Sequence, residues 1–179
     1  MAYTLLLGGA RSGKSAMAQR LALASALPVV VVATAEAGDA EMVERIRRHR
    51  EERPRGWRTL DAPLELGEAI GSVSHDSFFV LDCLTLWVSN LLGAGRSAES
   101  IIASASAIAA DLATRRGVVV TNEVGLGIVP ANELARAFRD ALGTVNARFA
   151  AAAERSVLMV AGRALMLEDA AALLQIAPD

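Results

Sequence analysis

Eight residues near the start of the chain have the composition of a phosphate-binding loop. Residues 8–15 read Gly-Gly-Ala-Arg-Ser-Gly-Lys-Ser, which fits the pattern G-x-x-x-x-G-K-S. Glycines let the backbone curl so that successive N–H groups point at phosphate oxygens, the lysine can reach the β- and γ-phosphates, and the final serine can ligate Mg²⁺. The residues predicted to bind phosphate are Gly8, Gly9, Ala10, Arg11, Ser12, Gly13, Lys14 and Ser15.

Lys14 is the only lysine among the 18 lysine and arginine residues of the chain. An ammonium group is a compact point charge, and a planar guanidinium fork does not fit the same place in the loop. We therefore expect Lys14 to be a catalytic residue of phosphate chemistry. The same count excludes the N-K-x-D element of guanine-specific regulatory GTPases, because that element needs a second lysine.

A carboxylate follows a later apolar run, where a partner for the metal is expected. Residues 77–82 read Ser-Phe-Phe-Val-Leu-Asp, so Asp82 would emerge from a buried strand beside the loop. Ser15 and Asp82 are therefore the predicted ligands of Mg²⁺ or its waters. Cys83, the only cysteine, is interpreted as a small core residue rather than a nucleophile, because no histidine adjoins it in sequence.

Residues 41–58 form an arginine-rich stretch that contains His49, one of only two histidines. On a helix, Met42, Ile46 and His49 lie on the same side, so the imidazole is expected to face the protein body or a cleft. Arginines around it would hold an anionic ligand against a nucleophilic imidazole. A partly buried histidine on a solvated basic helix is the alternative. Interleaved glutamates argue against an RNA-binding stretch.

The elements that must position these residues follow from apolar runs that are continuous rather than alternating. Such runs are typical of parallel strands covered on both faces, here residues 3–7, 29–33, 77–81, 117–121 and 156–160. Helices are predicted at 15–26, 39–52, 62–70, 84–92, 98–115 and 132–155, with Gly143 as a point where the last could break, and after Arg163 as a short helix ending at Pro178. The pattern predicts a three-layer α/β fold with a mostly parallel sheet and the phosphate site at the strand ends.

Composition narrows the class of protein further. At 179 residues and 53% hydrophobic content, residues 1–179 are expected to form a single domain. A net charge of −2 and 4% aromatic residues offer little to nucleic acid. One cysteine excludes an internal disulfide, and neither a signal peptide nor an apolar run of membrane-spanning length is visible. We expect a cytoplasmic protein with no nucleic-acid partner and no membrane span.

Four segments together resemble the bifunctional adenosylcobinamide kinase / adenosylcobinamide-phosphate guanylyltransferase family of cobalamin biosynthesis. They are the phosphate loop, residues 45–54 with Trp57, residues 82–87, and residues 121–130, which read Thr-Asn-Glu-Val-Gly-Leu-Gly-Ile-Val-Pro. The phosphate loop alone is generic, whereas the histidine segment and the last segment are specific. The resemblance spans nearly the whole chain and implies a P-loop NTPase of RecA-like fold that assembles as a homotrimer.

The resemblance also implies a two-step reaction. The γ-phosphate of ATP or GTP passes to the aminopropanol hydroxyl of adenosylcobinamide. GTP then guanylylates a histidine, by position His49, and the new phosphate takes up GMP to give adenosylcobinamide-GDP. Besides the phosphate loop, the implied nucleotide contacts are Ala33, Thr34, Ala35, Arg50, Glu51, Glu52, Arg53, Asp61 and Asp82. Asp61 stands where a glutamate is expected in some relatives.

Two other classes of protein share the nucleotide residues. A single-step phosphate-loop kinase for another small molecule would have no covalent stage, so a stable label on His49 separates it from the two-step enzyme. An interaction protein driven by ATP hydrolysis would show hydrolysis stimulated by a partner and no phosphorylated small product. Neither alternative explains the arginine-flanked histidine.

Overall fold

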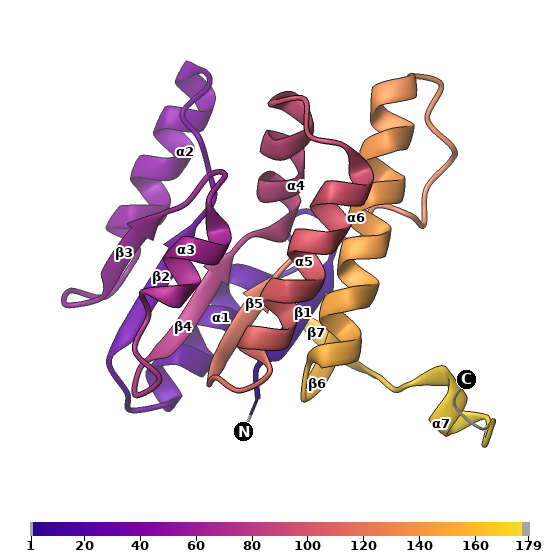
Figure 1. Cartoon of the computed structure of the whole chain (residues 1–179). Coiled ribbons are helices and arrows are strands. Elements are labelled where there is room, and N and C mark those ends of the chain that lie inside the picture. The colour runs from indigo at the N-terminus through magenta and orange to yellow at the C-terminus, as the bar shows by residue number, and fades with distance from the viewer. Residues whose placement is uncertain (1, 177–179) are drawn as a thin grey trace.

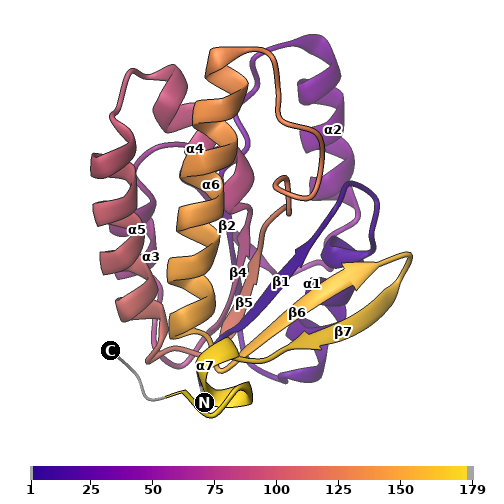
Figure 2. The same cartoon turned by 90° about the vertical axis from the view of Figure 1, so that its right-hand side faces the viewer.

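Within residues 2–176, which the computed structural model describes, the chain forms a seven-stranded sheet in the order β3-β2-β4-β5-β1-β6-β7 (Figures 1 and 2). Six strands are parallel, and the last pairs antiparallel with β6. Their bounds are β1 Thr4–Gly8, β2 Val29–Ala33, β3 Arg58–Asp61, β4 Phe78–Asp82, β5 Gly117–Val120, β6 Arg155–Val160 and β7 Arg163–Leu167.

Helices cover both faces of this sheet. The bounds are α1 Lys14–Ala24, α2 Ala40–Glu51, α3 Leu66–Gly71, α4 Leu84–Gly93, α5 Ala98–Leu112, α6 Glu133–Ala152 and α7 Ala170–Leu173. Figure 2 shows α3 to α6 on one face and α1 on the other, with α2 standing above the edge of the sheet. Across residues 2–176, none of the helices has the length and apolar character needed to cross a bilayer.

The core explains why the strands are continuously apolar. Successive residues of a strand point to opposite faces, so Leu5 packs in the cluster under α3 to α6 while Leu6 packs in the cluster under α1. Local caps set where the helices begin: the side chains of Asp39, Ser97 and Asn132 accept hydrogen bonds from the backbone N–H groups of the first turns of α2, α5 and α6. The prediction of a three-layer, mostly parallel α/β fold is confirmed.

Several predicted boundaries are wrong. Strand β3 was missed because it is a four-residue edge strand with a charged residue at each end. The helix predicted at 62–70 begins only at Leu66, because Pro63 follows and the Ala62 N–H continues the ladder to the Ala33 carbonyl. Helix α6 runs unbroken through Gly143 and ends at Ala152.

The C-terminal segment also differs from the prediction. Residues 163–167 form β7 instead of a helix, because a two-residue turn folds them back to pair with β6. A short helix does follow, as α7, whereas Pro178 lies outside the described residues. The missed strand is an edge strand, which lacks the doubly buried pattern of the central ones.

Two glycines test the packing of this core. Replacing Gly117 by alanine is expected to lower the free energy of unfolding by about 1–3 kcal/mol, because an added Cβ would overlap the buried ring of Phe79. Gly143→Ala is the matched control, since its Cβ would meet open space on α6 and should raise that free energy by about 0.5–1 kcal/mol. Urea unfolding followed by circular dichroism measures both, and equal midpoints would contradict the packing described.

Candidate nucleotide site

The phosphate loop leads from β1 into α1, and two of its glycines are required by the backbone. Gly8 has a φ of 150°, and an added Cβ would overlap the carbonyl oxygen of Met159 on the neighbouring strand β6. Gly13 caps α1 with a φ of 99°, in the left-handed region that favours glycine. The loop therefore takes its curled path because both positions lack a side chain.

Lys14 is buried at the start of α1, with only 7% of its surface exposed. Its Nζ donates hydrogen bonds to the carbonyl oxygens of Gly8 and Gly9, each 2.7 Å away. Burial lowers the pKa of the ammonium, and the Cys83 and Asp82 side chains act in the opposite direction. Of these two, Asp82 supplies the negative charge, because burial raises the pKa of the Cys83 thiol to about 11.

Beside the loop lies a small cavity of about 70 Å³. It is lined by residues of α1, α2 and α4, of the carboxyl ends of β2, β3 and β4, and of the segments that follow them, so it brings together residues that are far apart in sequence. Those that the sequence had nominated are Ser15, Ala33, Ala35, His49, Arg50, Arg53, Asp61 and Asp82. The loop residues 8–14 are not among the lining residues, although Ser15 directly follows them.

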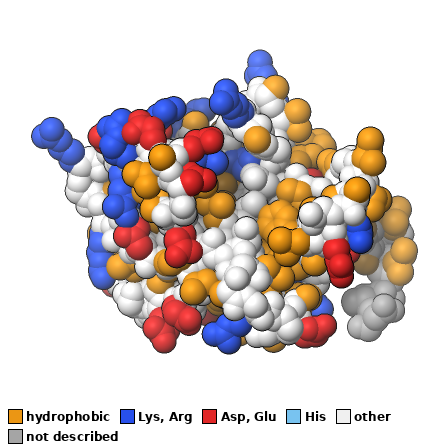
Figure 3. Space-filling view, turned by 90° about the horizontal axis from the view of Figure 1, so that it is seen from above, with side chains coloured by type: hydrophobic (Ala, Val, Ile, Leu, Met, Phe, Trp, Pro, Cys, Tyr) orange, Lys and Arg blue, Asp and Glu red, His pale blue; other side chains and the backbone are white. Residues whose placement is uncertain are grey.

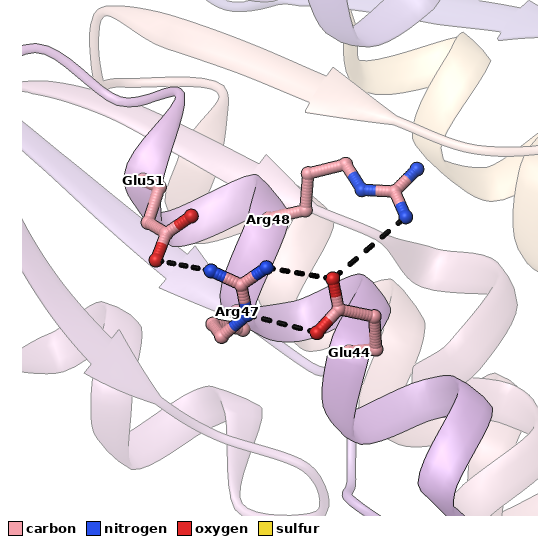
Figure 4. A network of polar contacts seen from close by, with 4 residues as sticks. All are labelled: Glu44, Arg47, Arg48 and Glu51. Atoms are coloured by element: carbon pink, nitrogen blue, oxygen red, sulfur yellow. Dashed lines mark hydrogen bonds and ion pairs between the residues drawn. The ribbon is translucent and has the colours of Figure 1, made fainter.

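Helix α2 turns His49 toward this cavity. Met42, Ile46 and His49 all line it, which confirms the shared side expected from their spacing. The outer face of the helix is tied by ion pairs of Arg47 with Glu44 and Glu51, while Arg48 approaches Glu44 at 3.9 Å (Figure 4). Such exposed pairs add little stability, but they hold the carboxylates of Glu44 and Glu51 away from the cavity.

Two arginines are held in place by β3. Both carboxylate oxygens of Asp61 accept hydrogen bonds from Arg50, at 2.7 Å each. The guanidinium of Arg53 donates to the Thr59 hydroxyl at 3.0 Å. Burial lowers the pKa of Arg53, and the charge of Asp82 opposes that effect. In this arrangement Asp61 orients an arginine, so a nucleotide that contacts Asp61 would also meet Arg50.

Besides the loop residues 8–14, three nominated residues lie outside the cavity. Thr34 is buried behind it, where its hydroxyl donates to the Cys83 carbonyl at 2.7 Å and accepts from the Cys83 N–H at 2.8 Å. Thr34 thus braces the turn that follows Asp82. Glu51 pairs with Arg47 on the outer face, and Glu52 is exposed beyond the end of α2. Their nucleotide contacts stay predictions.

The sequence did not nominate Arg45, which also lines the cavity. Its signal was available, because Arg45 precedes His49 by four positions and therefore lies on the same helical face. Asn90 was missed too: its side-chain amide donates to the Thr34 and Pro63 carbonyls at 2.8 and 3.1 Å. No local sequence pattern indicates that Asn90 joins these two carbonyls, since the three residues are distant in sequence.

The residues at the cavity are suited to a cation that is bound together with the phosphates of a nucleotide. Ser15 and Asp82 line the same cavity, and Mg²⁺ is commonly held by one or two carboxylates together with waters and phosphate oxygens. Within residues 2–176 there is no group of three or more histidine, cysteine, aspartate or glutamate side chains placed to hold a metal alone. The arrangement fits Mg²⁺ only as part of a nucleotide complex.

A second, larger cavity of about 350 Å³ lies between α3, α4 and α5. Its floor is made of core side chains such as Trp87 and Ile101, and none of the nominated residues lines it. Its size alone does not outweigh the chemistry of the smaller cavity, which holds the arginines, the histidine and Asp82.

Comparisons with known proteins bear on this site. A family model described as cobinamide kinase / cobinamide phosphate guanyltransferase matches residues 4–167. The chain is 43% identical over 167 residues to the bifunctional adenosylcobalamin biosynthesis protein CobP of Pseudomonas aeruginosa, covering 92% of this chain and 96% of that protein. It is 40% identical over 173 residues to the protein CobU of the same description from Salmonella typhimurium, covering 88% and 95%.

A likeness to a solved structure concerns the fold alone. An ATPase from the type III secretion system of pathogenic bacteria superposes with a TM-score of 0.53 at 11% sequence identity. The match covers 97% of this chain but only 53% of the ATPase chain, so this chain spans about half the length of that protein. The likeness is one of α/β fold.

The buried ammonium gives the first test of the site. Lys14→Ala is expected to weaken binding of a non-hydrolysable GTP analogue roughly 10- to 100-fold, the loss of charge-assisted hydrogen bonds to phosphate. Lys14→Arg should recover little of that affinity, because the fork does not fit the loop. Titration calorimetry measures the Kd, with Arg20→Ala, an exposed cation on the same helix, as control. An unchanged Kd for Lys14→Ala would show that the phosphate loop is not part of the nucleotide-binding site.

Proposed function

The chain belongs to the cobinamide kinase / cobinamide phosphate guanyltransferase family. From that membership we propose that it phosphorylates adenosylcobinamide with Lys14 as a catalytic residue, and that it transfers GMP through a covalent bond to His49. The family assignment makes it an enzyme with both activities. The further steps proposed are ATP or GTP as phosphate donor and a covalent guanylyl-histidine as the intermediate between GTP and adenosylcobinamide phosphate.

One observation carries the proposal: His49 lines the same cavity as Ser15 and Asp82. A nucleotide held by the phosphate loop therefore has its phosphate chain within the space that the imidazole faces. A single-step kinase needs the loop, the carboxylate and positive charge, but its reaction has no step that requires an imidazole at the same cavity.

The kinase step uses the phosphate loop. The hydroxyl oxygen of adenosylcobinamide forms a bond to the γ-phosphorus and gives up its proton to solvent, the bond from that phosphorus to the β,γ-bridging oxygen breaks, and a nucleoside diphosphate leaves. Lys14 and the N-terminus of α1 stabilise the charge that develops on the phosphate oxygens. Ser15 and Asp82 would hold Mg²⁺, which neutralises phosphate charge when it is bound.

The guanylyl step uses the opposite wall. An imidazole nitrogen of His49 forms a bond to the α-phosphorus of GTP, and pyrophosphate leaves. A phosphate oxygen of adenosylcobinamide phosphate then attacks the same phosphorus and displaces the imidazole, which gives adenosylcobinamide-GDP. Arg45, Arg50 and Arg53 line the cavity, where their charges favour the departing pyrophosphate.

The setting of the enzyme is proposed from the family likeness and the composition. We propose that it works in the cytoplasm as a homotrimer of single-domain chains, without nucleic acid. The net charge of −2 and the low aromatic content support the last point.

The covalent step is tested at His49. After incubation with α-labelled GTP and denaturation, the wild type should retain label through a phosphorus–nitrogen bond that is labile in acid and stable in alkali. His49→Ala should lose this label and the guanylyl transfer, while phosphorylation of adenosylcobinamide continues, because the γ-phosphate depends on Lys14 instead. His75→Ala, at the other, exposed histidine, should behave as wild type. Label retained in His49→Ala would overturn the covalent role, and no label in the wild type would favour a single-step kinase.

The metal is tested at Asp82. Asp82→Asn should keep the fold but shift the Mg²⁺ dependence of the kinase reaction to higher concentration, since a neutral amide offsets the cation's charge less well. A Mg²⁺ titration of initial rates measures the shift. Asp76→Asn, an exposed carboxylate before the other end of β4, is the control. Superimposable curves for Asp82→Asn and wild type would place the metal elsewhere.

A further inference from the structure

The loop between β5 and α6, residues 121–132, begins beside the phosphate loop. The Glu123 N–H donates to the Gly8 carbonyl at 3.3 Å, and the Thr121 N–H donates to the Leu6 carbonyl at 3.0 Å. On its other side, the Asn122 N–H donates to the Thr85 hydroxyl of α4 at 2.8 Å. The base of this loop therefore lies between the phosphate loop and the start of α4, next to where a phosphoryl acceptor must approach.

This base is fixed by buried polar contacts. Asn146 of α6 is 5% exposed; its amide donates to the Asn122 carbonyl at 3.0 Å and accepts from the Thr121 hydroxyl at 2.7 Å. The carboxylate of Glu123 accepts the Gly125 N–H, which closes a tight local turn. The segment that follows is thus presented from a rigid support.

Beyond the turn, the loop is apolar and exposed. Leu126 is 85% exposed, Ile128 97% and Val129 62%, and Leu134 in the first turn of α6 is 66% exposed. No charged residue occurs between Val124 and Asn132. Single exposed apolar residues are ordinary, but several on one segment beside a reaction site are typical of a binding surface.

The wall formed by α2 differs in charge. Seen from above, arginines and acidic side chains are mixed at the upper left of the molecule, whereas hydrophobic side chains gather over the right half (Figure 3). The acceptor is a corrin, a broad ring with apolar faces and amide arms, and its hydroxyl sits on a short aminopropanol arm. A cavity of about 70 Å³ cannot hold such a ring, so the ring must rest outside while the arm reaches in.

We propose that the exposed apolar side chains of residues 126–134 form the surface on which the corrin ring of cobinamide lies. The proposal rests on the proposed function and assigns the substrate a place at the same site. Leu126 and Ile128 would contact a ring face. Gly127 is exposed and its backbone N–H and C=O groups are open to the amide arms of the corrin, whereas the Gly125 N–H is taken up by Glu123.

The test is a double variant, Leu126→Ser with Ile128→Ser, with binding measured by equilibrium dialysis of cobinamide followed through its own corrin absorbance. The Kd for cobinamide should rise at least about tenfold, as two aliphatic contacts are lost. The Kd of a GTP analogue should stay unchanged. In the kinase assay KM for adenosylcobinamide should rise similarly, with kcat within about twofold of wild type. The control is Leu23→Ser with Leu173→Ser, which are exposed leucines on α1 and α7.

The outcomes separate this inference from the proposed function. An unchanged cobinamide Kd in the double variant overturns the inference while leaving the enzyme's activities intact. A lower sedimentation coefficient with unchanged cobinamide affinity also overturns it, and would assign the loop to a contact between copies of the chain. Wild-type protein that neither binds nor phosphorylates cobinamide would overturn the proposed function and the inference together.

Discussion

Parallel pairing sends the carboxyl ends of the strands to one edge of the sheet, and every part of the site depends on it. Along this edge Ala33 of β2 pairs in register with Asp61 of β3 and with Asp82 of β4, and Asp82 pairs with Val120 of β5. The phosphate loop leaves the same edge from β1. The register of β2, β4 and β5 thus aligns three features of the site: the Asp82 carboxylate, the turn at Cys83 that Thr34 holds, and the loop that leads from β5 to α6.

The charges at this edge are divided between two faces of α2. Glutamates on its outer face pair with Arg47, so they do not neutralise the arginines of the inner face. Arg50 is oriented by Asp61, and Arg53 by a neutral hydroxyl. The inner face therefore keeps positive charge toward the cavity, as a site for polyanionic nucleotides requires, while the helix as a whole stays well solvated.

Features that depend on a few neighbouring residues could be predicted from the sequence, whereas contacts between distant segments could not. The loop residues, the position of Asp82 after an apolar run, and the side of α2 that carries His49 all follow from spacing along a few residues. Strand β3 is short and charged at its ends, so its pairing with β2 left no pattern, and the Arg50–Asp61 contact was hidden with it. The clamp by Asn146 on Asn122 joins segments 24 residues apart, which no local rule detects. The surface proposed for the corrin ring overlaps residues 121–130, which the sequence marked only as one of the segments that resemble the family.

The placement of Lys14 also matters for anyone who modifies this protein chemically. It is the only side-chain amine in the sequence, and it is buried against the carbonyls of the loop. Acylating reagents, which elsewhere scatter over many lysines, have one side-chain target here, and a neutral amide at that place can no longer attract phosphate. Acylation of Lys14 would therefore inactivate the protein, whereas its many arginines do not react with such reagents.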